Sequence, residues 1–443
     1  MQLLCKVAEF DEWPGADAKI REKFRTFENM KPIHARRWLS LLLVVVFCPS
    51  PGATQDRILP AAERTAVYLP LLQGKKVGVF ANQTSLIGSR HLVDSLRSLG
   101  VDIRKIFGPE HGFRGQANAG EKIKNYIDPG TGIPVVSLYG QKQKPAPEDL
   151  DSLDLLLFDI QDVGNRFYTY ISSLQEFMEA AIEQHKPLLL LDRPNPNGHY
   201  VDGPVLDTRF SSFVGMQPVP INYGMTIGEY ARMLLGEKWL SEKANAIHAY
   251  NITTQPTADT PFHFLVIKCG NYTHQSNYSL PVRPSPNLPE MQAIYLYPTT
   301  CLFEGTALSE GRGTSKPFEY IGHPDLPHNL FSFTPNPNEG AQRSKHYGQV
   351  CYGWNFGGTE EEVRARTGNR IQLGWLLQAY GLFPDKEKFF LTNGSFNRLA
   401  GNDQLMRQIR EGKSEAEIRQ SWEPALSQFK LIRKKYLLYP GFE

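Results

Sequence analysis

Short apolar runs alternate with amphipathic stretches between residues 75 and 192. The apolar runs are rich in Val, Ile and Leu and predict five strands, at 76–81, 102–107, 134–139, 153–159 and 187–192. The amphipathic stretches repeat apolar residues at helical spacing and predict helices at 91–99, 170–184 and 226–235. This order of elements is typical of an α/β fold built on a mostly parallel sheet.

The pattern changes after about residue 240. Clusters of proline and asparagine, at 281–289 and 335–338, separate short strand-like runs at 264–268 and 349–353. Helical patterns return at 371–380, 404–411 and 423–436. We therefore expect two domains, an α/β domain over residues 54–240 and a smaller α+β domain over 241–443 that docks on the first.

Residues 1–53 have a different character. Arg36 and Arg37 precede an apolar run at 39–47, and small residues follow as far as Ala53. This order is that of a secretory signal, and the run is too short to span a membrane. The pattern predicts export to the periplasm or the cell exterior, with cleavage near Ala53.

Two details of this segment affect that prediction. Met30 is a natural start for the signal, so residues 1–29 are interpreted as an upstream extension of the reading frame. Cys48 is a poor site for lipid attachment, because Val46 and Phe47 precede it and Pro49 follows it. We expect cleavage of the signal rather than a lipid anchor.

Composition narrows the possible partners. The chain has 443 residues, of which 41% are hydrophobic and 21% charged, an ordinary globular balance. Outside residues 1–53 the basic and acidic side chains are equal in number. Because nucleic-acid affinity comes mainly from neutralised phosphates, no nucleic-acid partner is expected.

Several motifs are missing from the sequence. The first strand is followed by Asn82-Gln83-Thr84 instead of a glycine-rich nucleotide loop, and no Walker loop or Gly-x-Ser-x-Gly elbow occurs. Beyond the signal, Cys269, Cys301 and Cys351 are odd in number and lack metal-type spacing, so buried free thiols are expected. The sequence predicts no cofactor and disfavours an esterase.

Polar side chains gather where the five predicted strands end. In parallel sheets these carboxyl ends meet at one edge, where ligands bind. Each residue alone has an alternative interpretation as a helix cap or turn residue, but their coincidence predicts a site. These residues are Asn82, Gln83, Glu110, His111, Tyr139, Asp159, Asp162, Arg166, Tyr168, Asp192, Arg193 and Asn195.

The second predicted domain repeats this chemistry. Glu304, Glu310 and Arg312 stand among glycines, as Glu110 does in Gly-Pro-Glu-His-Gly. A cleft between the domains, with Glu110 on one wall and Glu304 or Glu310 on the other, suits glycoside hydrolysis by paired carboxylates.

Amide and guanidinium groups in such a cleft suit hydroxyl, acetamido or carboxylate groups of a sugar. Asn82, Gln83, Asn195, Arg166 and Arg312 are the candidates. Glu110, His111, Asp159 and Asp162 are also residue types that bind divalent ions. Hydrogen bonding explains this set equally well, and no metal is predicted.

Taken together, these motifs resemble the bacterial exo-β-N-acetylmuramidases, a family long catalogued as a domain of unknown function. The resemblance runs from about residue 60 to the C-terminus. It rests on residues 77–84, Gly-Pro-Glu-His-Gly-Phe-Arg-Gly at 108–115, 159–170, Asp-Arg-Pro-Asn-Pro at 192–196, 224–226, 284–287 and 303–314.

The resemblance implies a Rossmann-like catalytic domain, a smaller auxiliary domain and an active site between them. It also implies release of N-acetylmuramic acid from the non-reducing ends of peptidoglycan fragments, without a cofactor. Glu110 matches the family motif and is the first catalytic candidate. Glu310 is preferred to Glu304 as its partner, and Asp159 and Asp162 rank behind both. Substrate-binding roles are expected for Asn82, Gln83, His111, Arg166, Tyr168, Asp192, Arg193, Asn195 and Arg312.

Two alternatives stay open at this point. One is a muropeptide-binding protein that keeps the cleft but has no catalytic activity. The other is a metal-dependent phosphoryl or acyl hydrolase. The sequence contains no distance between carboxylates, so retention and inversion of the anomeric configuration are equally open.

Overall fold

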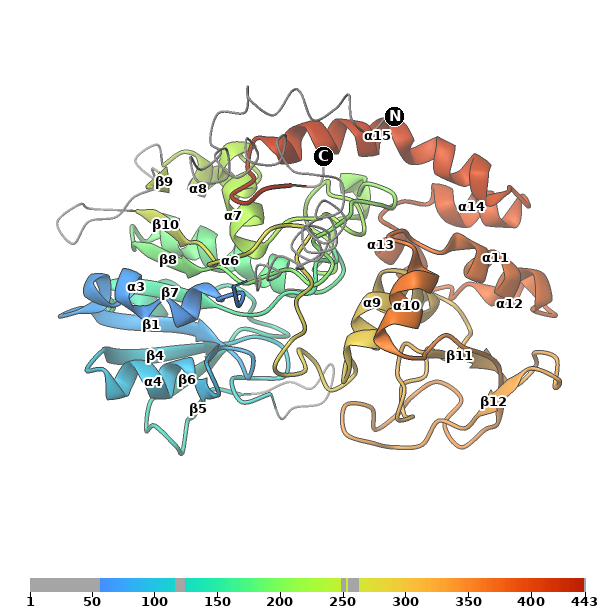
Figure 1. Ribbon diagram of the computed structural model, residues 1–443, viewed down its shortest axis with the longest axis horizontal. Coiled ribbons are helices and arrows are strands. Elements are labelled where there is room, and N and C mark those ends of the chain that lie inside the picture. Colours follow the sequence, from blue (N-terminus) through green and yellow to red (C-terminus); the bar gives the residue numbers. More distant parts are fainter. Residues whose placement is uncertain (1–55, 116–123, 248–251, 254–262, 442–443) are drawn as a thin grey trace, which may run out of the picture. The chain divides into compact units, whose positions relative to one another are not determined.

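The computed structural model describes residues 56–115, 124–247, 252–253 and 263–441 (Figure 1). The described residues from Ile58 onward belong to one compact unit. The segment interpreted as an export signal lies outside the described residues. None of the helices in the described part of the chain is long and apolar enough to cross a membrane.

An eight-stranded sheet, in the order β5-β6-β4-β1-β7-β8-β10-β9, forms the centre of the fold. Only β5 runs antiparallel to its neighbour, and the other pairs are parallel. The strands are β1 (Lys76–Ala81), β4 (Asp102–Gly108), β5 (Tyr126–Ile127), β6 (Pro134–Ser137), β7 (Leu155–Asp159), β8 (Leu188–Leu191), β9 (Ile252–Thr253) and β10 (Phe264–Ile267). All five predicted strands are present, and the α/β fold class is confirmed.

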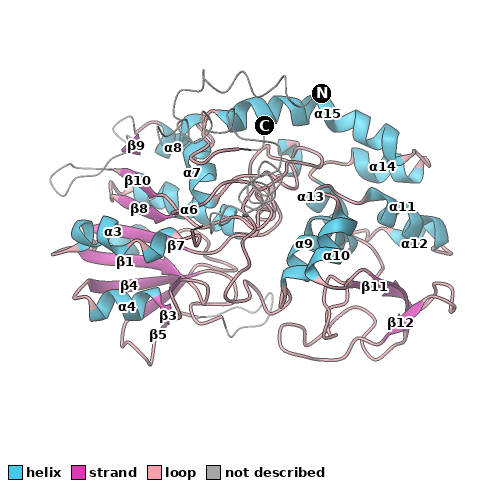
Figure 2. Ribbon diagram, in the orientation of Figure 1, coloured by secondary structure: helices cyan, strands magenta, loops and turns pink. Residues whose placement is uncertain are grey.

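Helices cover both faces of this sheet (Figure 2). One face packs on α3 (Thr65–Leu72) and α4 (Leu92–Ser98), and the other on α6 (Tyr170–Glu183) and α7 (Ile227–Gly236). Because side chains alternate along a strand, Val79 belongs to the first core and Phe80 to the second. Phe80 stacks on Phe158 at 4.7 Å between ring centroids. Burial on both faces explains why the strands read as continuous apolar runs.

One predicted strand belongs to a different sheet from the one expected. The sequence pattern predicts the run at 264–268 in the second domain, but β10 pairs in parallel with β8, from Phe264 opposite Leu188 to Ile267 opposite Leu191. The large sheet therefore continues beyond residue 240. The apolar pattern identified the strand, whereas its partner depends on a connection of more than seventy residues, which local periodicity does not encode.

The chain after residue 290 forms a smaller region of helices and one antiparallel sheet. Its sheet has the order β11-β13-β12. Its elements are α9 (Met291–Thr300), η4 (Cys301–Gly305), β11 (Tyr320–His323), β12 (Phe331–Phe333), β13 (Cys351–Asn355), α10 (Glu360–Thr367), α11 (Leu373–Leu382), α12 (Lys386–Phe389), α13 (Ser395–Ala400), α14 (Gln404–Arg410) and α15 (Glu415–Lys434). The three predicted helices are present, and the last begins earlier, at Glu415, because Ser414 caps it by accepting from the Glu417 amide.

Short elements complete the description. They are η2 (Ala61–Glu63), β2 (Leu86–Ile87), β3 (Arg90–His91), α5 (Pro147–Leu150), η3 (Thr208–Phe210) and α8 (Glu242–Asn245). Cys269, Cys301 and Cys351 are buried free thiols, as expected.

The end of the chain returns to the large sheet. Arg433, on α15, donates through Nε and Nη2 to the Gly224 carbonyl at 2.9 and 2.7 Å. Tyr439 donates to Oδ2 of Asp192 at 2.6 Å, directly after β8. These bonds fasten the C-terminal helices to the edge of the sheet where the polar residues gather.

Candidate active site

The register of the sheet brings the ends of the central strands together. Ala81 pairs with Asp159, and Gly108 pairs with Ser137. Asn82, Glu110 and Tyr139 therefore follow neighbouring strands at one edge, as the sequence predicted.

Glu110 is the partly exposed carboxylate at this edge. It lies in a tight turn in which His111 has φ of 68° and Gly112 φ of 76°. Tyr139 donates its O–H to Oε1 at 2.8 Å, and Thr169 donates to Oε2 at 3.3 Å. Burial and the nearby Glu110 charge raise the pKa of Tyr139. The phenol therefore stays protonated and orients the carboxylate.

A tyrosine pair lies beside this glutamate. Asn82 donates through Nδ2 to the Tyr170 hydroxyl at 2.8 Å. Tyr168 and Tyr170 both donate to the Pro284 carbonyl, at 2.9 and 3.2 Å. Gln83 donates to the same carbonyl at 2.9 Å. Two predicted site residues, Gln83 and Tyr168, thus hold the segment around Pro284 against the strand ends, and Asn82 supports it through Tyr170.

His111 supports the same segment. Its Nε2 lies 3.1 Å from Oγ of Ser285, and the imidazole is buried. The left-handed backbone at His111, which is uncommon for a residue other than glycine, turns this ring inward beside Glu110.

Aromatic rings connect these strand ends to the second acidic group. Tyr168 meets Tyr297 at 6.0 Å between centroids, and Tyr297 meets Phe318 at 4.8 Å. The Arg312 guanidinium lies 5.0 Å from the centre of the Phe318 ring. Arg312 is also near enough to Tyr139 to oppose the increase in the phenol's pKa. The predicted residues of the two regions therefore belong to one neighbourhood.

Arg312 joins the two glutamates of the second group. Its Nη2 lies 2.6 Å from Oε1 of Glu304, and its Nε lies 3.3 Å from Oε1 of Glu310. Glu304 exposes 29% of its side chain and Glu310 only 5%. Although burial favours the neutral acid, Lys345 and Arg312 hold the pKa of Glu310 below its usual value. Glu304 is the more accessible carboxylate.

The two aspartates after β7 are enclosed. Asp159 forms a buried bidentate pair with Arg193, at 2.6 and 2.7 Å. Asp162 accepts through Oδ2 from the Gly164 amide at 2.6 Å and from the Tyr223 hydroxyl. Oδ1 of Asp162 has no hydrogen-bond partner among the described residues. Burial raises the pKa of Asp162 to about 6.

Other predicted binding residues have partners within the chain. Arg166 is fully buried and donates to the carbonyls of Pro204, Val219 and Leu399 at 2.7–2.9 Å. Asp192 accepts from Thr226 and from the Gly228 amide at the start of α7. These contacts join elements of the fold, so they favour structural roles.

Asn195 and Arg193 also have their hydrogen-bond partners within the chain. Asn195 donates to the Met225 carbonyl at 2.8 Å and accepts from the Asn197 amide at 2.8 Å. Arg193 is occupied by Asp159 and the Leu86 carbonyl. Polar residues after a strand suit both ligands and turns, and their burial in the structure favours turns here.

Two groups near the site were absent from the predicted site residues. Thr169 directly precedes α6, and Lys345 lies about forty residues after Glu304. The sequence places Tyr139 at this edge without assigning it a role. The position of Tyr139 after β6 was a usable signal, whereas nothing in the local sequence indicates the partners of Lys345.

Among the described residues, no group of three or more His, Cys, Asp and Glu side chains is arranged to hold a metal ion. Where the carboxylates have partners, these are hydroxyl, amide, guanidinium and ammonium groups, as described above.

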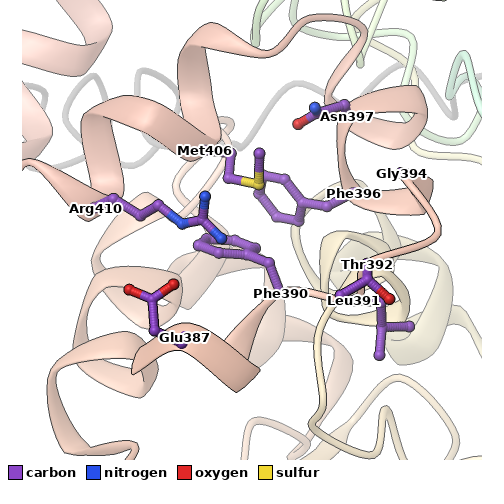
Figure 3. A pocket seen from close by; sticks show the side chains of 9 residues that line it. All are labelled: Glu387, Phe390, Leu391, Thr392, Gly394, Phe396, Asn397, Met406 and Arg410. Carbon is purple, nitrogen blue, oxygen red and sulfur yellow. The ribbon is translucent and has the colours of Figure 1, made fainter. Parts of the chain in front are cut away.

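A separate pocket of about 210 Å³ lies among α12, α13 and α14 (Figure 3). Phe390, Phe396 and Met406 provide its apolar lining, and Glu387 and Arg410 its charged groups. None of the predicted site residues lines it. It lies behind the loop that carries Glu304, since Leu391 donates to the Gly305 carbonyl at 3.0 Å.

Comparison with known proteins gives consistent results. Residues 77–292 match the N-terminal family model of the exo-beta-N-acetylmuramidase NamZ, and residues 295–439 match the C-terminal model. The peptidoglycan beta-N-acetylmuramidase NamZ of Bacillus subtilis (strain 168) is 39% identical over 398 residues, which cover 84% of this chain and 89% of that protein.

Two crystal structures of DUF1343 family proteins from Bacteroides fragilis NCTC 9343 are similar. One is 42% identical, covers 87% of this chain and 100% of its own, and has a TM-score of 0.76. The other is 27% identical, covers 86% and 99%, and has a TM-score of 0.68. The shared fold extends over both the large sheet and the C-terminal region.

Proposed function

The chain belongs to the exo-β-N-acetylmuramidase family NamZ, and on this premise we propose that it is an exo-acting glycoside hydrolase. Its substrates are peptidoglycan fragments, and its product is N-acetylmuramic acid released from their non-reducing ends. The observation that carries the proposal is Glu110, an accessible carboxylate held by two O–H donors at the strand ends of a chain from this family.

Glu110 is assigned the first catalytic role. Tyr139 and Thr169 bind its two oxygens and fix the plane of the carboxylate. A positioned carboxylate transfers a proton to or from the glycosidic oxygen, or attacks the anomeric carbon, with little reorganisation during the reaction.

Glu304 is assigned as its partner, in place of Glu310, which the sequence favoured. Both glutamates contact Arg312, but Glu310 is almost fully enclosed while Glu304 exposes 29% of its side chain. A group that works on a sugar must reach it. Glu310 then supplies negative charge that orients Arg312 and Lys345.

Arg312 is the candidate to recognise the acidic group of the substrate. N-acetylmuramic acid carries a lactyl carboxylate, which a glucosaminide lacks. Arg312 exposes 23% of its side chain, and its contacts with Glu304 and Glu310 use only part of its five N–H donors. A guanidinium pairs with a carboxylate more specifically than an ammonium does.

The proposal includes export of the protein from the cytoplasm. Residues 30–53 have the order of a secretory signal, and peptidoglycan lies outside the cytoplasm. The mature protein is expected in the periplasm or outside the cell, and fractionation of cells that express the full chain tests this.

The function is tested with two chromogenic substrates, a β-N-acetylmuramide and the matching β-N-acetylglucosaminide. The expected result is release from the muramide alone, unchanged by a chelator. Release from the glucosaminide alone would correct the substrate. Binding of muropeptides without release from either would identify a binding protein, and activity that a chelator removes and added metal restores would identify a metal-dependent hydrolase.

A further inference from the structure

The ammonium group of Lys345 lies in a cage of oxygen atoms. It donates to the carbonyls of Phe303, Glu304 and Thr306 at 3.0 Å and to that of Leu308 at 2.9 Å. Its Nζ also lies 3.1 Å from Oε2 of Glu310. Five oxygens thus surround one nitrogen that has only three protons. They are therefore attracted to the positive charge of the ammonium group as well as to its individual N–H donors.

The carbonyls converge because the chain turns around this charge. Phe303 and Glu304 are at the end of η4, where the Phe303 carbonyl also accepts from the amide and the hydroxyl of Thr306, at 3.0 and 2.8 Å. The Gly305 carbonyl points the other way, to the Leu391 amide. The Ala307 carbonyl is bound by Nε2 of His346 at 2.7 Å. Residues 345 and 346 therefore bind most of the carbonyls between 303 and 308.

Without a cation this arrangement is unfavourable. Four carbonyl dipoles and the Glu310 carboxylate, which is only 5% exposed, direct negative charge at one point, where Lys345 exposes 26% of its side chain. Rings of carbonyl oxygens are also what replaces the hydration shell of potassium in proteins that bind it.

We propose that Lys345 is a built-in monovalent cation that positions Glu304 and Glu310, and that its removal leaves a site for a potassium-sized ion. The carbonyl of Glu304 itself is one of its ligands, so the charge fixes the backbone that carries this side chain. Lys345 is a positioning residue. The test of this role by activity rests on the proposed function, whereas the test by thermal stability does not.

The test uses Lys345→Ala, and Lys345→Met as a second variant that keeps the apolar stem. Lys316→Met is the matched control, because Lys316 contacts the side chains of Glu290 and Glu319 and no cage of carbonyls. The thermal midpoint is measured in ammonium, potassium, lithium and tetramethylammonium chloride at equal ionic strength.

In lithium or tetramethylammonium, both Lys345 variants are expected to melt roughly 5 °C or more below the wild type. Ammonium and potassium are expected to restore at least half of this shift in Lys345→Ala, with no such preference in the wild type or in Lys316→Met. Equal thermal midpoints of Lys345→Ala in all four salts would overturn the proposal. Failure of both Lys345 variants to fold in ammonium chloride would overturn it as well.

Turnover provides the second readout. The kcat of Lys345→Ala is expected to fall about tenfold or more and to recover in ammonium, with a smaller change in KM. If the wild type has no muramidase activity, the proposed function fails while the ion-selective midpoint still decides the role of Lys345. An ion-selective midpoint with unchanged kcat would overturn the positioning role.

Discussion

The two carboxylates of the candidate site are held in different ways. Glu110 follows β4 in the large parallel sheet, and the hydroxyls of Tyr139 and Thr169 orient it. Glu304 lies in a loop whose backbone carbonyls surround the Lys345 ammonium. The first position results from strand topology, and the second from one charge that is distant in sequence.

This difference has consequences for function and stability. On the Glu110 side the donors are neutral hydroxyls that follow β6 and precede α6, so small losses there should affect orientation more than folding. The loop around Glu304 combines buried charges, and removing one partner leaves the others uncompensated. Variants at the enclosed charges of this loop, Glu310 and Lys345, should therefore lower stability, whereas a variant of the more exposed Glu304 should lower activity with less effect on stability.

The largest expected effect belongs to Glu110→Gln. The amide keeps the shape of the side chain but cannot exchange a proton or act as a nucleophile, so kcat should fall roughly 100- to 10,000-fold. The thermal midpoint should change little, and a muropeptide should still bind in calorimetry. A variant that keeps more than about a tenth of the wild-type rate would limit Glu110 to binding.

The comparison of Glu304→Gln with Glu310→Gln separates the two roles in the loop. Glu304→Gln should lower kcat about 100-fold with little loss of stability, because its side chain is partly exposed. Glu310→Gln should mainly lower the thermal midpoint, since Lys345 and Arg312 lose a buried partner. The opposite pattern would restore Glu310 as the catalytic partner.

Gly305→Ala tests how closely the loop must pack. A Cβ at Gly305 would lie 2.4 Å from the Cα of Phe396, on the backbone of α13, so η4 or α13 must shift. We expect a loss of roughly 1–3 kcal/mol in the free energy of unfolding and a lower kcat. Gly381→Ala is the control, because nothing lies within 4 Å of its Cβ position, and chemical denaturation compares the two.

Tyr139→Phe should have a smaller effect on activity. It removes the 2.8 Å hydrogen bond to Oε1 of Glu110 and keeps the ring. Hydrogen bonds to charged groups contribute roughly 1.5–3 kcal/mol, so kcat should fall about tenfold to a hundredfold. Thr169→Val removes a longer bond, and steady-state kinetics should show a smaller decrease. Equal kcat values for the wild type, Tyr139→Phe and Thr169→Val would contradict the proposal that the two hydroxyls orient Glu110.

Asp162 makes the stability of the protein depend on pH. Its pKa is raised by burial from 3.8 to about 6, so between these values the folded protein keeps a proton that the unfolded chain has released. The free energy of unfolding therefore decreases as the pH rises from about 4 to about 6, by up to roughly 3 kcal/mol. Asp162→Asn should lack this component, which thermal midpoints at several pH values would reveal. If the thermal midpoints of the wild type and of Asp162→Asn changed with pH in parallel, the contribution of Asp162 would be contradicted.

The same contrast explains what the sequence could predict. The five central strands and the clustering of Asn82, Glu110 and Tyr139 at one edge follow from local periodicity, because parallel strands align their carboxyl ends. Residue type alone did not distinguish Glu110, which is accessible, from Asp192 and Arg166, which are buried and bonded to the chain. Burial depends on segments that are distant in the sequence, such as the one that brings the Leu399 carbonyl to Arg166.

The less predictable part lies after residue 240. The strand at 264–267 was identified, but its pairing with β8 was not. The partners of Lys345 lie about forty residues before it, and most are backbone carbonyls, which any residue type provides. The domain boundary at 240 stays a prediction, while the two family models meet near residue 293.

The most direct test of the two-carboxylate account is a crystal structure of Glu110→Gln with a bound disaccharide that has N-acetylmuramic acid at its non-reducing end. The account predicts the scissile bond between Gln at position 110 and Glu304, with an oxygen or nitrogen of each side chain within about 3.5 Å of the anomeric carbon, the glycosidic oxygen or a water between them. A sugar bound with its glycosidic bond beyond about 6 Å from both side chains would contradict it.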